Sequence, residues 1–191
     1  FHFVALQYQK ISLDEQDFIQ NLLDPKTQNT AFQQLLKEYQ RPLYSLIRNI
    51  VLNHDDADDV LQNTFVKVFQ NLKNFKGESK LFSWMYRIAT NEAITFINKK
   101  AKRNGITSEA LQSKIVDNLK ADDYFDGDLI QIKLQKAIAL LPQKQQLVFK
   151  MRYFDEIKYE DMSETLGTSV GALKASYHHA VKKIEIYMTS N

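Results

Sequence analysis

Hydrophobic residues return at helical spacing along most of this chain. In residues 55–72 the apolar positions fall three or four residues apart, at Leu61, Phe65, Val68, Phe69 and Leu72. Residues 79–102 repeat the pattern at Phe82, Met85, Tyr86, Ala89, Ala93 and Phe96. This spacing places each set on one face of an amphipathic helix. No stretch of any length alternates apolar and polar residues as a strand does, so the chain is predicted to be all-α.

The predicted helices form two groups, and the glycines and prolines stand mostly at the breaks between helices. The first group comprises residues 30–52, 55–72 and 79–102. The second group comprises residues 129–141, 143–154, 159–166 and 169–188. In the first group, the apolar faces can bury one another in a bundle of three or four helices.

The segment between the two groups, residues 104–128, loses the helical pattern and gains Asp, Asn, Ser and Gly. It carries six acidic side chains against two basic ones, whereas the regions on either side are mildly basic. We interpret it as a flexible acidic linker with one turn of helix around residues 109–119. The chain then divides into an N-terminal extension, a first helical domain, this linker and a second helical domain, at residues 1–25, 26–103, 104–128 and 129–191.

Composition narrows the chemistry that the chain can perform. The 191 residues include no cysteine, which excludes disulfides, thiolate metal sites and a cysteine nucleophile. The four histidines form no helical metal motif, and no nucleophile–base pair or phosphate loop stands out. We therefore predict no metal, no cofactor and no enzymatic activity. No run reaches the roughly 20 apolar residues of a membrane span and no secretory signal is evident, so a cytoplasmic protein is expected.

The two helices predicted at residues 159–166 and 169–188 are joined by Gly167-Thr168-Ser169, which suits a helix-turn-helix. Glycine accepts the left-handed turn, and the serine hydroxyl can cap the next helix. One face of the last helix is apolar; the other presents Gly171, Lys174, Ala175, His178, His179 and Lys182. Small residues and hydrogen-bond donors on an exposed face are typical of a helix that reads the major groove. An ordinary amphipathic surface helix is the alternative.

Aromatic and basic residues interleave in residues 75–103. Aromatic rings can stack on unpaired bases while lysines and arginines follow the backbone, so this stretch is a candidate for single-stranded nucleic acid. Three of its aromatics, Phe82, Tyr86 and Phe96, fall on the apolar face and are assigned to the core. Trp84 lies off that face, and either role is open to it.

Four aspartates open the helix predicted at residues 55–72: Asp55, Asp56, Asp58 and Asp59. The helix dipole favours carboxylates in a first turn without any metal. The spacing of a calcium-binding loop is absent. A surface for a basic partner protein is the better functional interpretation.

Two long strings of the sequence resemble one known family. The string DDADDVLQNTFVKVFQNLKNFKGESKLFSWMYRIATNEAITFINKKAKR resembles region two of the extracytoplasmic-function sigma factors, and ALLPQKQQLVFKMRYFDEIKYEDMSETLGTSVGALKASYHHAVKKI resembles their region four. With the helix before them, the match covers residues 30–188. It implies two helical domains, sigma region 2 and a helix-turn-helix sigma region 4, in a factor that directs promoter-specific transcription initiation. A stand-alone helix-turn-helix regulator with a helical effector domain is the alternative.

The resemblance implies three sets of contact residues. Those that bind the clamp helices of the polymerase's largest subunit are Asp56, Asp58, Asp59, Gln62, Asn63 and Phe65. Those that capture and melt the minus-ten element are Phe75, Lys76, Gly77, Glu78, Ser79, Lys80, Trp84, Arg87 and Asn91. Those at the minus-thirty-five element are Arg152, on a phosphate, and Lys174, Ala175, His178, His179 and Lys182.

Further partners implied are the flap of the second-largest subunit and an anti-sigma factor, with no small-molecule substrate. The reading helix departs from the common family pattern, which has arginines where Ser176 and His179 stand and a threonine where Ala172 stands. A neutral histidine offers one donor and one acceptor, unlike the bidentate arginine fork that prefers guanine. The departure therefore leaves open which bases are read.

Overall fold

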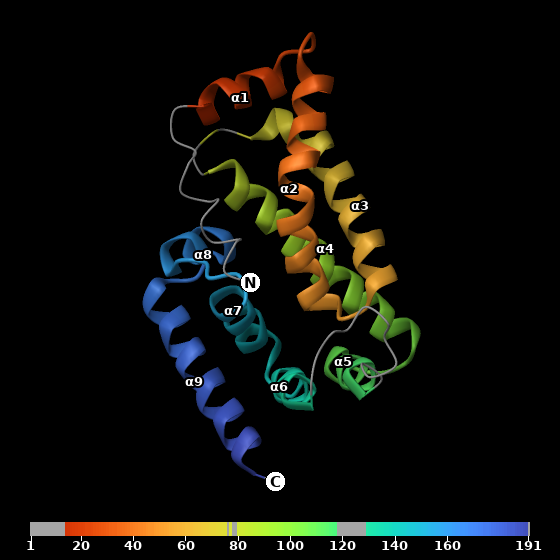
Figure 1. Cartoon of the computed structure of the whole chain (residues 1–191), viewed down its shortest axis with the longest axis vertical. Coiled ribbons are helices and arrows are strands. Elements are labelled where there is room, and N and C mark those ends of the chain that lie inside the picture. Colours follow the sequence, from red (N-terminus) through yellow and green to blue (C-terminus); the bar gives the residue numbers. More distant parts are fainter. Residues whose placement is uncertain (1–13, 76, 78–79, 118–128, 191) are drawn as a thin grey trace.

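The structure is a computed structural model, and it describes residues 14–75, 77, 80–117 and 129–190 (Figure 1). Within those ranges all regular structure is helical, which confirms the predicted fold class. The elements are α1 (Asp14–Leu23), α2 (Gln28–Val51), α3 (His54–Asn71), η1 (Leu72–Asn74), α4 (Leu81–Arg103), α5 (Ser108–Asp117), α6 (Leu129–Ala139), α7 (Gln143–Tyr153), α8 (Tyr159–Leu166) and α9 (Val170–Thr189).

Helices α2, α3 and α4 pack on one another as the predicted bundle, with α1 across one end (Figure 1). The stripe predicted on α4 is buried at Met85, Tyr86, Ala89 and Ala93. On α3 one member of the predicted stripe is not buried. The Phe69 ring is 42% exposed and packs edge-on against Phe32, with 5.0 Å between the ring centroids.

The boundary between α2 and α3 shows how local sequence sets the helix ends. Leu52 closes α2 in a left-handed conformation with φ of 61°, and its amide donates to the carbonyl oxygen of Arg48. Asn53 follows as the N-cap of α3, and its side-chain oxygen accepts from the Asp56 amide at 2.9 Å. A side-chain acceptor at this position satisfies one of the free amides of the first turn.

Part of the predicted linker is a packed helix. Instead of a single turn, residues 108–117 form the ten-residue α5, which buries Leu111 and Val116 and lies against α4 and α6. Gln112, also on this helix, donates from Nε2 to the carbonyl oxygen of Ile50 at 3.4 Å. The remaining linker residues, 118–128, lie outside the described part of the chain.

The second group of helices has a small core of its own and also joins that of the first. Ala137, Phe149, Ala180 and Ile184 belong to a cluster formed by α6, α7 and α9. Val148, Met151, Met162 and Leu173 instead belong to the same cluster as the buried residues of α2, α3 and α4. Because α8 packs on α4 and α7 on α2, the two helical groups lie against each other (Figure 1).

Candidate nucleic-acid interface

The turn between α8 and α9 has the predicted geometry. Gly167 ends α8 with φ of 60°, in the left-handed region, and its amide donates to the carbonyl oxygen of Ser163. The Ser169 hydroxyl accepts from the Ala172 amide at 3.4 Å and caps α9. A glycine C-cap and a serine N-cap, separated by one residue, thus fix the angle between the two helices of a helix-turn-helix.

Helix α9 has one buried face and one exposed face. Leu173, Ala180 and Ile184 are buried. All of the side chains predicted to face DNA are exposed, namely those of Lys174, Ala175, His178, His179 and Lys182. The structure therefore places the predicted reading residues together on one open surface, and the helix is held by its other face.

Two cations converge on Tyr159, the first residue of α8. The Arg152 guanidinium carbon lies 5.3 Å from the centre of the Tyr159 ring, and Lys174 Nζ lies 5.7 Å from it. Arg152 also donates from Nη1 to the carbonyl oxygen of Ile157 at 3.2 Å. Cation–π contacts and this hydrogen bond orient both basic side chains, so the predicted phosphate ligand and the predicted base reader share one aromatic support.

The second predicted DNA site lies at the start of α4. Phe75 is 7% exposed, and its ring centre lies 5.1 Å from that of the half-buried Trp84. Gly77 has φ of 72°, with nothing within 4 Å of where a Cβ would stand, so its backbone conformation is what favours glycine. Lys80, Arg87 and Asn91 are exposed. The predictions for Lys76, Glu78 and Ser79 fall outside the described residues.

The predicted polymerase-binding residues of α3 are only partly available to a partner. Asp59, Gln62 and Asn63 are exposed. Asp56 accepts a hydrogen bond from Lys100 Nζ, and Asp58 lies 3.6 Å from His54 Nε2. Phe65 is 8% exposed and belongs to the hydrophobic core. Among the described residues no cluster of acids or histidines could hold a metal ion.

An ionisable cluster at the junction of the two helical groups was not foreseen from the sequence. Tyr86 of α4 is 2% exposed, and its hydroxyl donates to Asp155 Oδ2 at 2.7 Å. Burial raises the pKa of Asp155 to about 6, although the Tyr86 hydrogen bond and the Lys150 charge lower it. Burial likewise lowers the pKa of Lys150 to about 8, against the Asp155 charge, which raises it.

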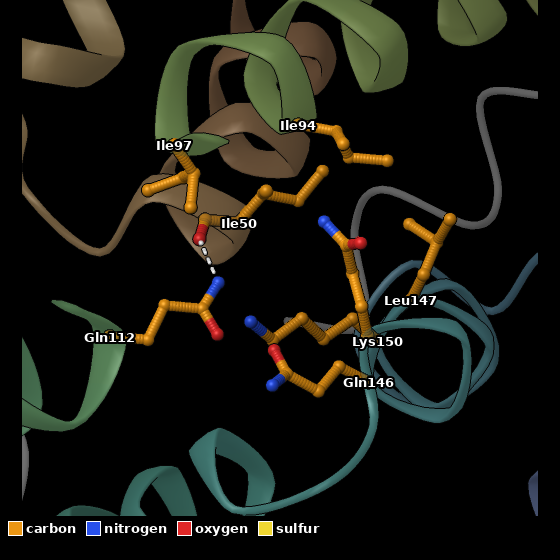
Figure 2. A pocket seen from close by; sticks show the side chains of 8 residues that line it. Ile50, Ile94, Ile97, Gln112, Gln146, Leu147 and Lys150 are labelled. Carbon is orange, nitrogen blue, oxygen red and sulfur yellow. Dashed lines mark hydrogen bonds between the residues drawn. The ribbon is translucent and has the colours of Figure 1, made fainter. Parts of the chain in front are cut away.

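Figure 2 shows Lys150 in a pocket between the two groups, with its side chain beside Gln112 of α5 and Gln146 of α7. Apolar side chains from the first group, including Ile50, Ile94 and Ile97, form the other wall. Gln146 Nε2 donates to the carbonyl oxygens of Ala139 and Leu141. No sequence pattern pointed to this pocket, because its residues come from helices far apart in the chain.

Comparison with known proteins decides the family. A family model of sigma-70 region 2 matches residues 35–103, and one of sigma-70 region 4 matches residues 131–184. The first covers α3, α4 and most of α2, and the second covers α7, α8 and most of α6 and α9. The chain belongs to the sigma-70 family. The presence of both sigma regions in family order leaves no support for the stand-alone regulator.

Curated relatives place this sigma factor in the extracytoplasmic-function group. It is 29% identical over 161 residues to the ECF RNA polymerase sigma factor SigW of Bacillus subtilis, covering 80% of this chain and 86% of that protein. It is 26% identical over 163 residues to the ECF RNA polymerase sigma-E factor of Haemophilus influenzae, covering 81% and 86%. The chain is therefore an ECF sigma factor, as the resemblance implied.

Solved structures share the fold of this sigma factor. RpoE in its complex with the anti-sigma factor NepR from Bartonella quintana aligns with a TM-score of 0.62 at 20% identity, over 84% of this chain and 98% of that one. CnrH in complex with the cytosolic domain of CnrY aligns with a TM-score of 0.68 at 17% identity, over 93% and 98%. None of the described helices is long and apolar enough to cross a membrane.

Proposed function

We propose that this sigma factor reads the minus-thirty-five element with α9 and the minus-ten element with residues 75–80 and the start of α4. The observation that carries the proposal is the division of α9 into a buried face and an exposed one. On that exposed face stand all five α9 side chains predicted to lie at the DNA. A groove-reading helix needs both a fixed orientation and free side chains.

The minus-ten assignment has support of a different kind. Lys80, just before α4, and Arg87 and Asn91, one turn apart on it, are exposed. Phe75 and Trp84 form an aromatic pair at the same end of the helix. Exposed cations can follow the phosphate backbone of an unpaired strand. The aromatic pair can hold the proposed base-binding site in one conformation. In this assignment Phe75 acts mainly as a support, because its ring is buried.

For the polymerase, we propose that α3 docks on the clamp helices of the largest subunit through Asp59, Gln62 and Asn63. Phe65 would act from the core by holding α3 straight, and Asp56 by pairing with Lys100. Residues 129–191 would bind the flap of the second-largest subunit. The protein would work where the polymerase works, in the cytoplasm, with no substrate, no cofactor and no catalytic activity of its own.

An anti-sigma factor is the second proposed protein partner. Two structures with the same fold are complexes: RpoE is bound to the anti-sigma factor NepR, and CnrH to the cytosolic domain of CnrY. We propose that a protein of that class holds this factor inactive by binding to both helical groups.

The described arrangement, with its two helical groups in contact, does not suit simultaneous reading of two distant promoter elements. Elements named for positions ten and thirty-five are about 25 base pairs apart, which is about 85 Å along duplex DNA. Yet α8, which leads into the reading helix, packs on α4, and Tyr86 is bonded to Asp155. We therefore propose that residues 26–103 and 129–191 act as two domains that separate when the factor joins the polymerase.

Run-off transcription tests the proposal. Core polymerase is incubated with and without the purified chain on a library of genomic promoter fragments, and start sites are mapped. We expect transcripts with common minus-ten and minus-thirty-five sequences only when the chain is present. Tight sequence-specific binding to duplex DNA without polymerase, and no new start sites with it, would contradict the proposal.

A further inference from the structure

Helix α1 precedes the matched sigma-70 region 2, which begins at residue 35. It is nevertheless a fixed part of the first helical group. Leu22 is 1% exposed and belongs to the main core. The end of α1 is closed by two side chains that follow it: Thr27 Oγ1 donates to the carbonyl oxygen of Asn21, and Gln28 Nε2 donates to that of Leu22. These bonds satisfy carbonyls that a helix end leaves free.

The other end of α1 reaches the start of α4. Glu15 Oε1 accepts a hydrogen bond from the Leu81 amide at 2.8 Å, across 66 positions of the sequence. Leu81 is the first residue of α4, and Lys80 before it makes no side-chain cap. A lysine ammonium has only donors and cannot accept from an amide. Glu15 therefore does from another helix what an N-cap residue does locally.

The charge of Glu15 suits this place for two reasons. Helix N-termini carry a partial positive charge, which a carboxylate stabilises. Glu15 also lies close to Tyr39, whose ring stacks on Phe82 of the first turn of α4 with 5.8 Å between centroids. Burial, then the charges of Glu38 and Glu15, raise the pKa of Tyr39 to about 12, so this hydroxyl stays neutral beside Glu15.

The capped amide stands at one end of the segment proposed to read the minus-ten element. At the other end, the Phe75 amide donates to the carbonyl oxygen of Leu72 at 3.0 Å, and the Phe75 ring is buried against Trp84. Phe75 and Leu81 are thus each held by a backbone amide hydrogen bond. The acceptor for the Phe75 amide belongs to η1, and the acceptor for the Leu81 amide belongs to α1.

We propose that Glu15 is a positioning residue for the start of α4, acting through the Leu81 amide to fix where this helix begins and so where Trp84, Arg87 and Asn91 stand for minus-ten reading. This inference rests on the proposed function, because it assigns Glu15 to the service of that site. It gives α1 a role in DNA recognition without any contact to DNA. Glu15 itself is half-buried.

The cap is tested first on the free, full-length chain by amide hydrogen exchange. Glu15→Ala removes the acceptor, Glu15→Gln keeps an amide oxygen in the same place, and Asp17→Ala removes one charge from the exposed side of the same helix. We expect exchange at Leu81 to become about fivefold faster in Glu15→Ala, as for loss of an N-cap. Asp17→Ala is expected to stay near wild type, and Glu15→Gln, which keeps the acceptor oxygen but loses the charge, is expected to exchange more slowly at Leu81 than Glu15→Ala. Unchanged exchange at Leu81 in Glu15→Ala would overturn the proposal.

The second measurement uses holoenzyme and a single-stranded non-template oligonucleotide that carries the minus-ten sequence. Glu15→Ala is expected to weaken its binding about fivefold and to reduce the preference for the captured base, while core-polymerase affinity stays unchanged. Glu15→Gln should recover most of both properties, because it keeps the acceptor oxygen. Faster exchange at Leu81 with normal oligonucleotide binding would overturn the positioning role. Equal loss of core affinity would do so too, because it indicates a general folding defect.

The two measurements also separate this inference from the proposed function. If wild-type holoenzyme shows no preference for the minus-ten oligonucleotide, the proposed function fails and the positioning role fails with it. The exchange measurement still reports the cap in that case. If wild type discriminates among the bases and Glu15→Ala discriminates equally well, only the positioning role fails.

Discussion

At the scale of single residues, the proposed reading of the minus-thirty-five element rests on the exposed face of α9. Histidines at positions 178 and 179 are exposed and lie side by side, with 6.0 Å between ring centroids. Lys174, one turn earlier, is held near Tyr159 together with Arg152. In the proposed complex, a base edge would meet a lysine of restricted position and two imidazoles, in place of a row of arginine forks.

Lys174→Ala is expected to change the preference among minus-thirty-five sequences. Loss of a base contact costs about 1–3 kcal/mol on the sequences that use it and little on others. The measurement is holoenzyme affinity across promoters that vary only in this element. Lys183→Ala is the matched control, because it removes the same charge from another side of α9, where Lys183 bonds Gln145 at 3.1 Å. A uniform loss of affinity in Lys174→Ala would instead make Lys174 a phosphate ligand.

Sequence alone identified which α9 residues are exposed, because a helix with 3.6 residues per turn fixes its faces. It did not identify the exposure of Phe69. Phe65 and Phe69 both fall within the predicted apolar stripe at a spacing of four, and which of them meets α2 depends on how the helices cross. Nor did it suggest that Lys150 is 3% exposed, since nothing nearby in the sequence marks a buried lysine.

At the scale of elements, turn chemistry carries as much information as periodicity. The α8–α9 turn was predicted from three residues, and the structure has the expected C-cap and N-cap. For α5 the sequence predicted only one turn of helix, because the helix has ten residues and many of them are polar. Helix α1 was missed for a similar reason: its position depends on Leu22 reaching the core and on Glu15 capping α4, and both are tertiary contacts.

Gly167→Ala is expected to destabilise the second helical group by about 1 kcal/mol. A Cβ meets no atom within 4 Å there, so the cost comes from φ of 60°, which L-residues with a side chain disfavour. Gly171→Ala is the matched control, because Gly171 lies in α9 at an ordinary φ with equally open space. It should be neutral or stabilising. Denaturant unfolding checks both variants, and equal midpoints would contradict the left-handed turn.

At the scale of the whole molecule, the unforeseen feature is the contact between the two helical groups. Tyr86 and Asp155 are 69 positions apart, and nothing in either neighbourhood predicts that they pair. The sequence predicted two domains and a linker but not that the domains pack together. Because the proposed reading of two distant promoter elements requires separation, this contact is one that polymerase binding has to break.

The closed arrangement should depend on pH through Asp155. Its pKa is raised to about 6 when closed, so the closed form holds a proton that the open form, with an ordinary pKa near 3.8, releases. Closure is therefore most stable below about pH 4 and weakens as pH rises through about 6. Lys150 works in the opposite direction, because its pKa is lowered to about 8: closure is most stable above about pH 10.5 and weakens as pH falls through about 8.

Energy transfer between dyes on the two groups measures this effect in the free protein. The chain has no cysteine, so Lys73→Cys and Glu185→Cys, both at exposed positions, give specific labelling. Between pH 5 and 7 we expect transfer to fall as Asp155 ionises. Asp155→Asn keeps an oxygen that can accept from the Tyr86 hydroxyl but cannot ionise, so its transfer should stay constant over this range. A wild-type pH response in Asp155→Asn would assign the effect to other groups.

The central claim is that one chain reads two promoter elements with two separate helical groups, and site-specific crosslinking in the polymerase–promoter complex tests it most directly. A photoreactive side chain is placed at His178 on α9 or at Arg87 on α4, both exposed. We predict crosslinks near minus thirty-five from the first position and near minus ten, on the non-template strand, from the second. Crosslinks from both positions to one element, or none from α9 to DNA, would contradict the claim.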